Sequence, residues 1–310
     1  MYHILQFAMQ FLDGLGSMLN RERPDISVIL TSARFGGMDI LYQCMSAQIF
    51  DGTFEVIMCD EFYDNRQEFF SNSFRDARFQ FVHLPPKRHC NLYDDSLGIN
   101  TALAAAVGDL IVILADYTWA PVNYLQEHYQ FFKTHDGFTM STYLDRFPLP
   151  PMKGEPYSIE RDWWSVFQED FEPGWFDGRE PVYRERRGCV GKVHEDGKVE
   201  IPGDYVYLLG DSVPLSVVKD LNGIDERYIG GYGSNDVCFG TRANHIGHRW
   251  ALNPHVRLNK LTISGQAQIP RKAKPKVRQP EDNYRFFQAR RRAVTEGRES
   301  PRVPEGWGLE

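Results

Sequence analysis

The feature that most constrains the fold of this chain is an unbroken apolar run, residues 110–114, inside the segment 100–125. An alanine-rich stretch with helical spacing precedes the run and reaches Gly108, and the lone carboxylate of Asp116 follows it. A β-branched run bounded by glycine and polar residues is typical of a strand buried on both faces. Asp116 would then lie at the carboxyl end of the strand, where open α/β sheets bind ligands. The alternative is that Asp116 merely caps the following turn or helix.

Two earlier apolar runs, residues 26–30 and 54–59, also end in polar loops. Strands that alternate with helical segments indicate βαβ units and a parallel sheet, so both loops should open at the same edge as Asp116. The polar side chains that these two loops bring to that edge are Thr31, Ser32 and Arg34 from the first and Asp60 from the second. Asp60 could equally be a helix N-cap, and Arg34 an ordinary surface cation.

A second informative segment covers residues 223–242, where four glycines within eleven residues precede a predicted helix. Such a turn permits a close backbone approach to a ligand. Asp236 would begin the helix, where a carboxylate is also simply favourable to the helix dipole. Between the two segments, residues 144–209 are dense in proline, glycine and aromatics, which indicates a long ordered excursion. Trp163 and Trp164 in this excursion could stack on a sugar or a nucleobase, although a core role is the commoner one.

Together these motifs resemble the family 2, GT-A type nucleotide-sugar glycosyltransferases. The matching positions are Asn100, Ala102, Leu103, Ala106, Gly108, Asp109, Leu114, Ala115, Asp116, Pro121 and Leu125, with the glycine-rich turn and Asp236 downstream. The resemblance implies an α/β fold of the GT-A (Rossmann-like) kind, with a mixed, mostly parallel sheet flanked by helices. It also implies an enzyme that transfers a hexose from a nucleoside-diphosphate sugar, most simply a UDP-sugar, to a hydroxyl with inversion.

The same resemblance assigns roles to individual residues. Asp236 matches the general base. The implied donor-binding residues are Thr31, Ser32, Arg34, Asp60, Asn100, Ala115 and Asp116, and the acceptor-side residues are Trp163, Trp164, Tyr232, Gly233 and Asn235.

The family's Asp-x-Asp triplet holds a divalent cation, Mn²⁺ or Mg²⁺, on the diphosphate. This chain keeps Asp116, but Leu114 replaces the first aspartate. Lys260 aligns with a histidine that often completes the metal site, and His255 would supply that ligand in a shifted register. Metal binding by Asp116 and His255 is therefore one expectation, and replacement of the cation's charge by Lys260 is the other.

The acceptor class stays open at this stage. A glycan or a lipid-linked sugar is what the resemblance implies by default. The C-terminal residues 270–310 carry 11 Lys and Arg against 6 Asp and Glu in a chain of net charge −7, which leaves room for a hydroxymethylated base of viral DNA as acceptor. A solvated, partly disordered terminus is the commoner reason for such a basic tail. A non-catalytic nucleotide-sugar-binding or scaffold protein is a further alternative.

Composition sets the remaining expectations. The 310 residues suit an amphipathic N-terminal helix (1–25), one glycosyltransferase domain (26–265) and a basic tail with a short helix (266–310). Five cysteines without CxxC spacing favour reduced thiols and a cytoplasmic protein. The apolar stretch at the N-terminus is too short to span a bilayer, so no integral membrane segment is expected.

Overall fold

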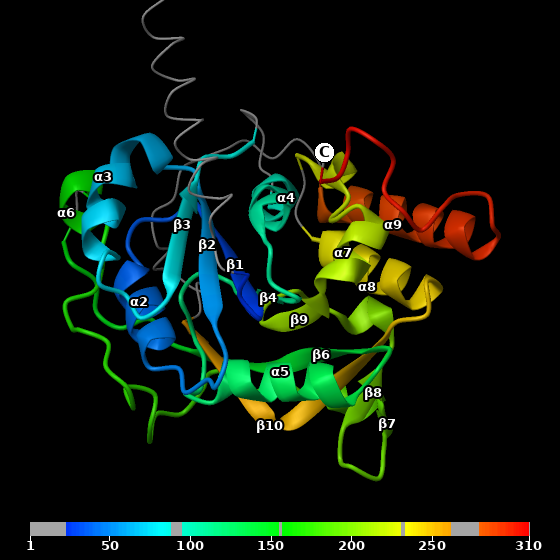
Figure 1. The fold of residues 1–310 in the computed structure, drawn as a ribbon, viewed down its shortest axis with the longest axis horizontal. Helices are drawn as coiled ribbons and strands as arrows, with labels where there is room; N and C mark the ends of the chain where they lie inside the picture. The colour runs from blue at the N-terminus through cyan, green and yellow to red at the C-terminus, as the bar shows by residue number, and fades with distance from the viewer. Residues whose placement is uncertain (1–22, 88–94, 155–156, 231–232, 262–278, 310) are drawn as a thin grey trace, which may run out of the picture.

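The computed structural model describes residues 23–87, 95–154, 157–230, 233–261 and 279–309. Its central sheet has the strand order β3-β2-β1-β4-β9 (Figure 1). The bounds are β1 Ile26–Ser32, β2 Phe54–Asp60, β3 Gln80–Leu84, β4 Leu110–Ile113 and β9 Asp211–Pro214. The first four strands are parallel, and β9 runs antiparallel to β4. The mixed, mostly parallel sheet expected from the apolar runs is confirmed.

Helices cover both faces of this sheet, which explains why its strands are continuously apolar. Helices α2 (Met38–Ser46) and α3 (Tyr63–Ser73) lie on one side of the sheet and α4 (Ser96–Ala105) on the other (Figure 1). Successive residues of a strand point to opposite faces. Accordingly, Val28 packs in the cluster that contains the α2 side chains, and Ile29 packs in the cluster that contains those of α4.

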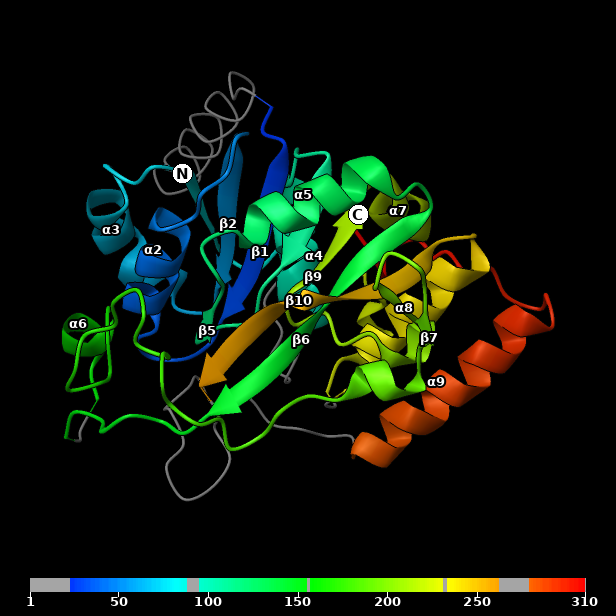
Figure 2. The ribbon, with the colours of Figure 1, turned by 90° about the horizontal axis from the view of Figure 1, so that it is seen from below.

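A second sheet lies against the first and contains the two longest strands (Figure 2). Its order is β5-β10-β8-β7, and β6 pairs with β10 in parallel. The bounds are β5 Thr118–Trp119, β6 Phe138–Phe147, β7 Lys192–Val193, β8 Val199–Ile201 and β10 Arg249–Leu261, with α5 (Tyr124–Thr134) between β5 and β6. The β7–β8 hairpin turns at Gly197, whose φ is 83°. Lys260, near the end of β10, pairs in register with Thr118 of β5, two residues after Asp116.

The aromatic excursion between β6 and β8 is mostly irregular, with the short helices α6 (Ile159–Asp162) and η1 (Arg187–Val190). Its tryptophans extend the core on the α2 and α3 side of the sheet. Trp163 stacks on Phe69 of α3 at 5.1 Å between ring centroids, and Trp164 lies 5.7 Å from Tyr42 of α2. The excursion is therefore attached to the domain through apolar packing.

The C-terminal third contributes helices on the β9 side (Figure 1). Their bounds are η2 Gly203–Tyr205, α7 Leu215–Leu221, η3 Glu226–Tyr228, α8 Asn235–His245 and α9 Pro280–Thr295. The predicted tail helix is present as α9, and it packs on α8 with Phe287 buried. The buried Arg290 pairs with Asp225 at 3.2 Å, and the N–H of the buried Val303 donates to the carbonyl of Leu221 at 2.9 Å. The described part of the tail thus packs on the domain.

The predicted N-terminal helix, residues 1–25, falls almost wholly outside the described residues. Within the described ranges, no helix is both long enough and apolar enough to cross a membrane. Cys44, Cys59, Cys189 and Cys238 are free thiols.

Candidate functional site

A cavity of about 600 Å³ opens at the carboxyl edge of the central sheet. The ends of β1, β2 and β4, the start of α4, the turn before α8, residue 260 of β10 and one face of α9 all line it. The sequence-predicted residues among its lining are Thr31, Ser32, Arg34, Ala115, Asp116, Gly233, Asn235 and Asp236. Asp116 and Asp236, which lie far apart in the chain, therefore border one cavity.

Asp116 is held by two cations from distant segments, the loop after β1 and the strand β10. The Arg34 guanidinium, from the loop after β1, donates to Asp116 Oδ2, and Lys260 Nζ lies 3.9 Å from Asp116 Oδ1. Tyr117, in a left-handed backbone conformation with φ 56°, donates its hydroxyl to the carbonyl of Phe35 and so ties the same two loops together. Burial of the Lys260 ammonium lowers its pKa to about 8, although the Asp116 carboxylate opposes that change.

Asp236 occupies the first turn of α8, directly after the glycine-rich turn. Its Oδ1 accepts a hydrogen bond from the N–H of Val237 at 2.8 Å. Burial raises the pKa of Asp236 to about 7, with smaller contributions from the carboxylates of Asp211 and Asp95. A carboxylate with such a pKa can accept a proton near neutral pH, which suits a general base.

Asp60 and Asn100 lie outside the cavity lining, and each ties together segments that form the cavity. Asp60 is fully buried. Its Oδ1 accepts from Phe62 N–H at 3.0 Å and lies 3.4 Å from the Arg66 guanidinium, and its Oδ2 lies 3.1 Å from His83 Nε2. The Asn100 amide, also fully buried, donates to the carbonyl of Ile224 and accepts from its N–H, both at 2.8 Å. Asp60 is thus linked through Arg66 to Ser32 and Arg34 of the cavity wall, and Asn100 links α4 to the segment at residue 224.

The remaining sequence candidates fall elsewhere. Trp163 and Trp164 pack on α3 and α2 as described above and do not line the cavity. His255 is exposed on β10, and the five residue steps from it to Lys260 span roughly 16 Å of extended strand. It therefore does not meet Asp116. Tyr232 lies outside the described residues.

Sequence reasoning missed several lining residues, above all those of α9. The cavity is also lined by Glu61, Asp95, Tyr207, Tyr284, Phe287 and Gln288. In α9, the spacing of Tyr284, Phe287 and Gln288 places them on one helix face, which is the signal that could have indicated a shared role. Asn283 of the same helix is buried, and its amide donates to the carbonyl of Gly233 at 3.2 Å, so α9 also holds the glycine-rich turn.

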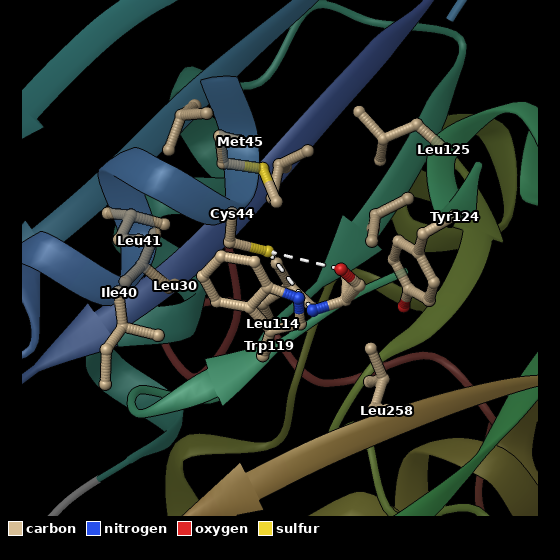
Figure 3. Close-up of a cluster of buried hydrophobic side chains, with 14 of the residues drawn as sticks. Leu30, Ile40, Leu41, Cys44, Met45, Leu114, Trp119, Tyr124, Leu125 and Leu258 are labelled. Atoms are coloured by element: carbon tan, nitrogen blue, oxygen red, sulfur yellow. Dashed lines mark hydrogen bonds between the residues drawn. The ribbon is translucent and has the colours of Figure 1, made fainter. Parts of the chain in front are cut away.

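The described side chains do not fit a divalent cation. Asp116 is already paired with Arg34 and faces Lys260, so the carboxylate is surrounded by positive charge. Leu114 is buried among apolar side chains that include Cys44 and Trp119 (Figure 3). Within the described ranges, no three His, Cys, Asp or Glu residues come together in a way that could hold a metal ion. The expected pair of Asp116 and His255 is not assembled.

Comparisons with known proteins agree with this architecture at the level of the fold. No family model matches the sequence, and no curated protein matches it. Residues 1–349 of S. aureus TarS, solved in complex with UDP-GlcNAc, are similar at a TM-score of 0.50 and 13% identity, over 78% of this chain and 62% of that chain. GalNAc-T7, solved with UDP, GalNAc and Mn²⁺, is similar at 0.50 and 10% identity, over 87% of this chain and 48% of that chain.

This chain therefore spans less than two thirds of the length of either structure. At such identities the likeness shows the fold. The protein has the α/β fold of the GT-A glycosyltransferases, a mixed sheet flanked by helices.

Proposed function

We propose that this protein is a glycosyltransferase that moves a hexose from a nucleoside-diphosphate sugar to an acceptor hydroxyl with inversion. One observation carries the proposal. Asp116, at the carboxyl end of a parallel strand, and Asp236, at the start of α8, line the same cavity of a GT-A fold. UDP is the expected nucleotide because the similar structures were solved with UDP or UDP-GlcNAc.

The donor side of the cavity would be its edge at β1 and β4. Thr31, Ser32 and Arg34 come from the loop after β1, and Ala115 and Asp116 from the loop after β4. This edge is where open α/β sheets bind nucleotides. Asp60 would support this edge indirectly through Arg66. The Arg66 guanidinium, which contacts Asp60, donates to the carbonyl of Arg34 at 2.7 Å and to the hydroxyl of Ser32 at 3.2 Å.

The acceptor side would be formed by Asp236, Asn235 and Gly233, with the adjacent face of α9. In the proposed step, the acceptor oxygen forms a bond to the anomeric carbon while the bond from that carbon to the diphosphate oxygen breaks. The electron pair of the broken bond leaves with the diphosphate, and Asp236 takes the proton of the acceptor hydroxyl. A single displacement of this kind inverts the anomeric centre.

The described tail gives only limited support to a DNA acceptor. Arg290 pairs with Asp225 and Glu299, Arg291 with Asp204 at 2.9 Å, and Arg298 with Glu296 at 2.5 Å. These arginines are paired within the domain, so their positive charge is partly neutralised. A hydroxyl of a glycan or a lipid-linked sugar is therefore the acceptor class that we put forward.

The test is release of nucleoside diphosphate from a panel of UDP-, GDP-, ADP- and dTDP-hexoses by the purified protein. The protein should consume one of these donors. Hydrolysis of that donor by water should be slow, and release of the diphosphate should be faster when an acceptor is present. Asp236→Asn should abolish turnover but leave donor binding intact. Asp220→Asn, at an exposed position of α7, is the matched control and should retain full activity. Binding of a donor without turnover would overturn the enzymatic proposal and favour a nucleotide-sugar-binding scaffold.

A further inference from the structure

The charge of the cavity poses a specific physical problem for an anionic ligand. Among the described lining residues the acidic side chains outnumber the basic ones. They are Glu61, Asp95, Asp116, Asp204 and Asp236, whereas the cationic side chains are Arg34 and Lys260. A diphosphate that enters this cavity needs nearby positive charge to offset the repulsion of these carboxylates.

Both cations are concentrated at one point, around Asp116. The Arg34 guanidinium donates to one oxygen of that carboxylate, and Lys260 Nζ lies 3.9 Å from the other. Each side chain is mostly buried, with 23% of Arg34 and 17% of Lys260 exposed. The single carboxylate thus gathers two positive charges from two different sheets.

The backbone at Arg34 is also held in place by hydrogen bonds. Its carbonyl accepts a hydrogen bond from the fully buried Arg66, which is anchored in turn by Asp60. The hydroxyl of Tyr117 holds the carbonyl of the next residue, Phe35. Because the backbone around Arg34 is fixed at two adjacent carbonyls, its guanidinium is pre-organised at the end of β4.

We propose that Arg34 and Lys260 bind the donor diphosphate directly, and that donor binding in this chain does not depend on a divalent cation. Asp116 orients the two cations. A guanidinium matches two phosphate oxygens at once, and an ammonium supplies a compact point charge, so the pair is suited to adjacent phosphates. The same two charges would stabilise the diphosphate as it departs.

This inference rests on the proposed function, since it takes a nucleoside diphosphate as the ligand. The test measures UDP affinity by titration calorimetry on the full chain, once in excess EDTA and once with Mn²⁺. Three variants accompany the wild type: Lys260→Met removes the charge, Lys260→Arg keeps it, and Lys219→Met alters an exposed lysine of α7 as the matched control. Thermal unfolding of each variant confirms that it is folded.

The expected result is that wild-type protein binds UDP equally well in EDTA and in Mn²⁺. The Lys260→Met protein should bind UDP about 10-fold or more weakly, because it loses a charge-assisted contact to phosphate. The affinities of Lys260→Arg and Lys219→Met for UDP should stay close to that of the wild type. Arg34→Gln is a second, independent variant with the same expected loss.

This inference would be overturned if UDP bound only with Mn²⁺ and if Lys260→Met did not change its affinity. The proposed function would be unaffected by that result. Failure of UDP and of the other nucleoside diphosphates to bind under either condition would overturn both.

Discussion

Lys260 Nζ lies 3.9 Å from Asp116 Oδ1, and this contact joins the last strand of the second sheet to the loop after β4 of the first. The pairing of Lys260 with Thr118 explains it, because β5 begins two residues after Asp116. A lysine therefore lies beside Asp116. One of the two expectations from the sequence was a metal-ligating side chain at this place, and the other was Lys260.

Turnover should depend on the ionisation of Asp236. Its pKa is raised to about 7 by burial, and only the deprotonated carboxylate can accept a proton from the acceptor. The value of kcat/KM should therefore rise with pH through about 7 and fall again above about pH 8, where Lys260 loses the positive charge proposed to bind the diphosphate. The measurement is nucleoside-diphosphate release between pH 5.5 and 9 with wild-type protein. A rate that is already maximal at pH 5.5 would contradict the assignment of Asp236 as base.

The buried carboxyl of Asp39, near the start of α2, should make the fold less stable as pH rises. Burial raises its pKa from 3.8 to about 6, so the folded state holds a proton that the unfolded state releases between these values. Asp39→Asn removes this ionisation. At pH 8 the variant should be more stable than wild type by on the order of 2 kcal/mol, and at pH 4 the two should be equal. Urea unfolding at the two pH values measures the difference, and equal gains at both would contradict the pKa assignment.

Asn283 should matter to the active site although its side chain does not line the cavity. Its amide holds the carbonyl of Gly233 in the turn before Asp236. Asn283→Ala leaves that turn without its partner and should cost about 1 to 2 kcal/mol of stability. It should also lower kcat more than it changes the affinity for UDP, because Asp236, the proposed base, is displaced while the proposed donor residues at β1 and β4 are untouched.

Arg285→Ala, at an exposed position of the same helix, is the control and should change neither quantity. An Asn283→Ala protein with unaltered kcat would show that the turn holds its shape without the hydrogen bond from Asn283.

Leu114→Asp should fail to restore a metal site. Leu114 is only 4% exposed and packs in the apolar cluster with Cys44 and Trp119 (Figure 3). Although Leu114 also borders the cavity, an aspartate there would lose the apolar packing and be largely withdrawn from water, at a cost of about 3 kcal/mol. Leu114→Met, which keeps the volume and the apolar character, should cost less than about 1.5 kcal/mol. Chemical unfolding measures both, and Mn²⁺-dependent UDP binding by a stable Leu114→Asp protein would contradict the prediction.

The secondary structure of the central domain was accessible from the sequence because local patterns determine it. The strands at Ile26–Ser32, Phe54–Asp60 and Leu110–Ile113 follow from apolar β-branched runs that end in polar loops. The edge at which these loops meet followed from the βαβ order alone. Predictions for side chains on those loops, such as Arg34 and Asp116, accordingly placed them on the cavity.

Residues whose environment depends on distant segments were harder to place. Asp60 ends its strand as expected, but the Arg66 and His83 side chains occupy both of its oxygens. Trp163 follows no local pattern that distinguishes a ligand platform from a core ring, and only the packing of α3 decides between them. Similarly, the basic composition of the tail says nothing about the burial of Phe287 and Arg290 against the domain.

By itself the sequence determined the strands β1, β2 and β4 of the central sheet, the edge of that sheet that carries polar side chains, and the two carboxylates, Asp116 and Asp236, at its separate motifs. These properties depend on neighbouring residues, whose spacing sets which face of an element is apolar. Only the tertiary structure decided that Arg34 and Lys260 surround Asp116 and that α9 lines the cavity. These contacts join segments far apart in the chain, so they depend on how whole elements pack and not on any local pattern.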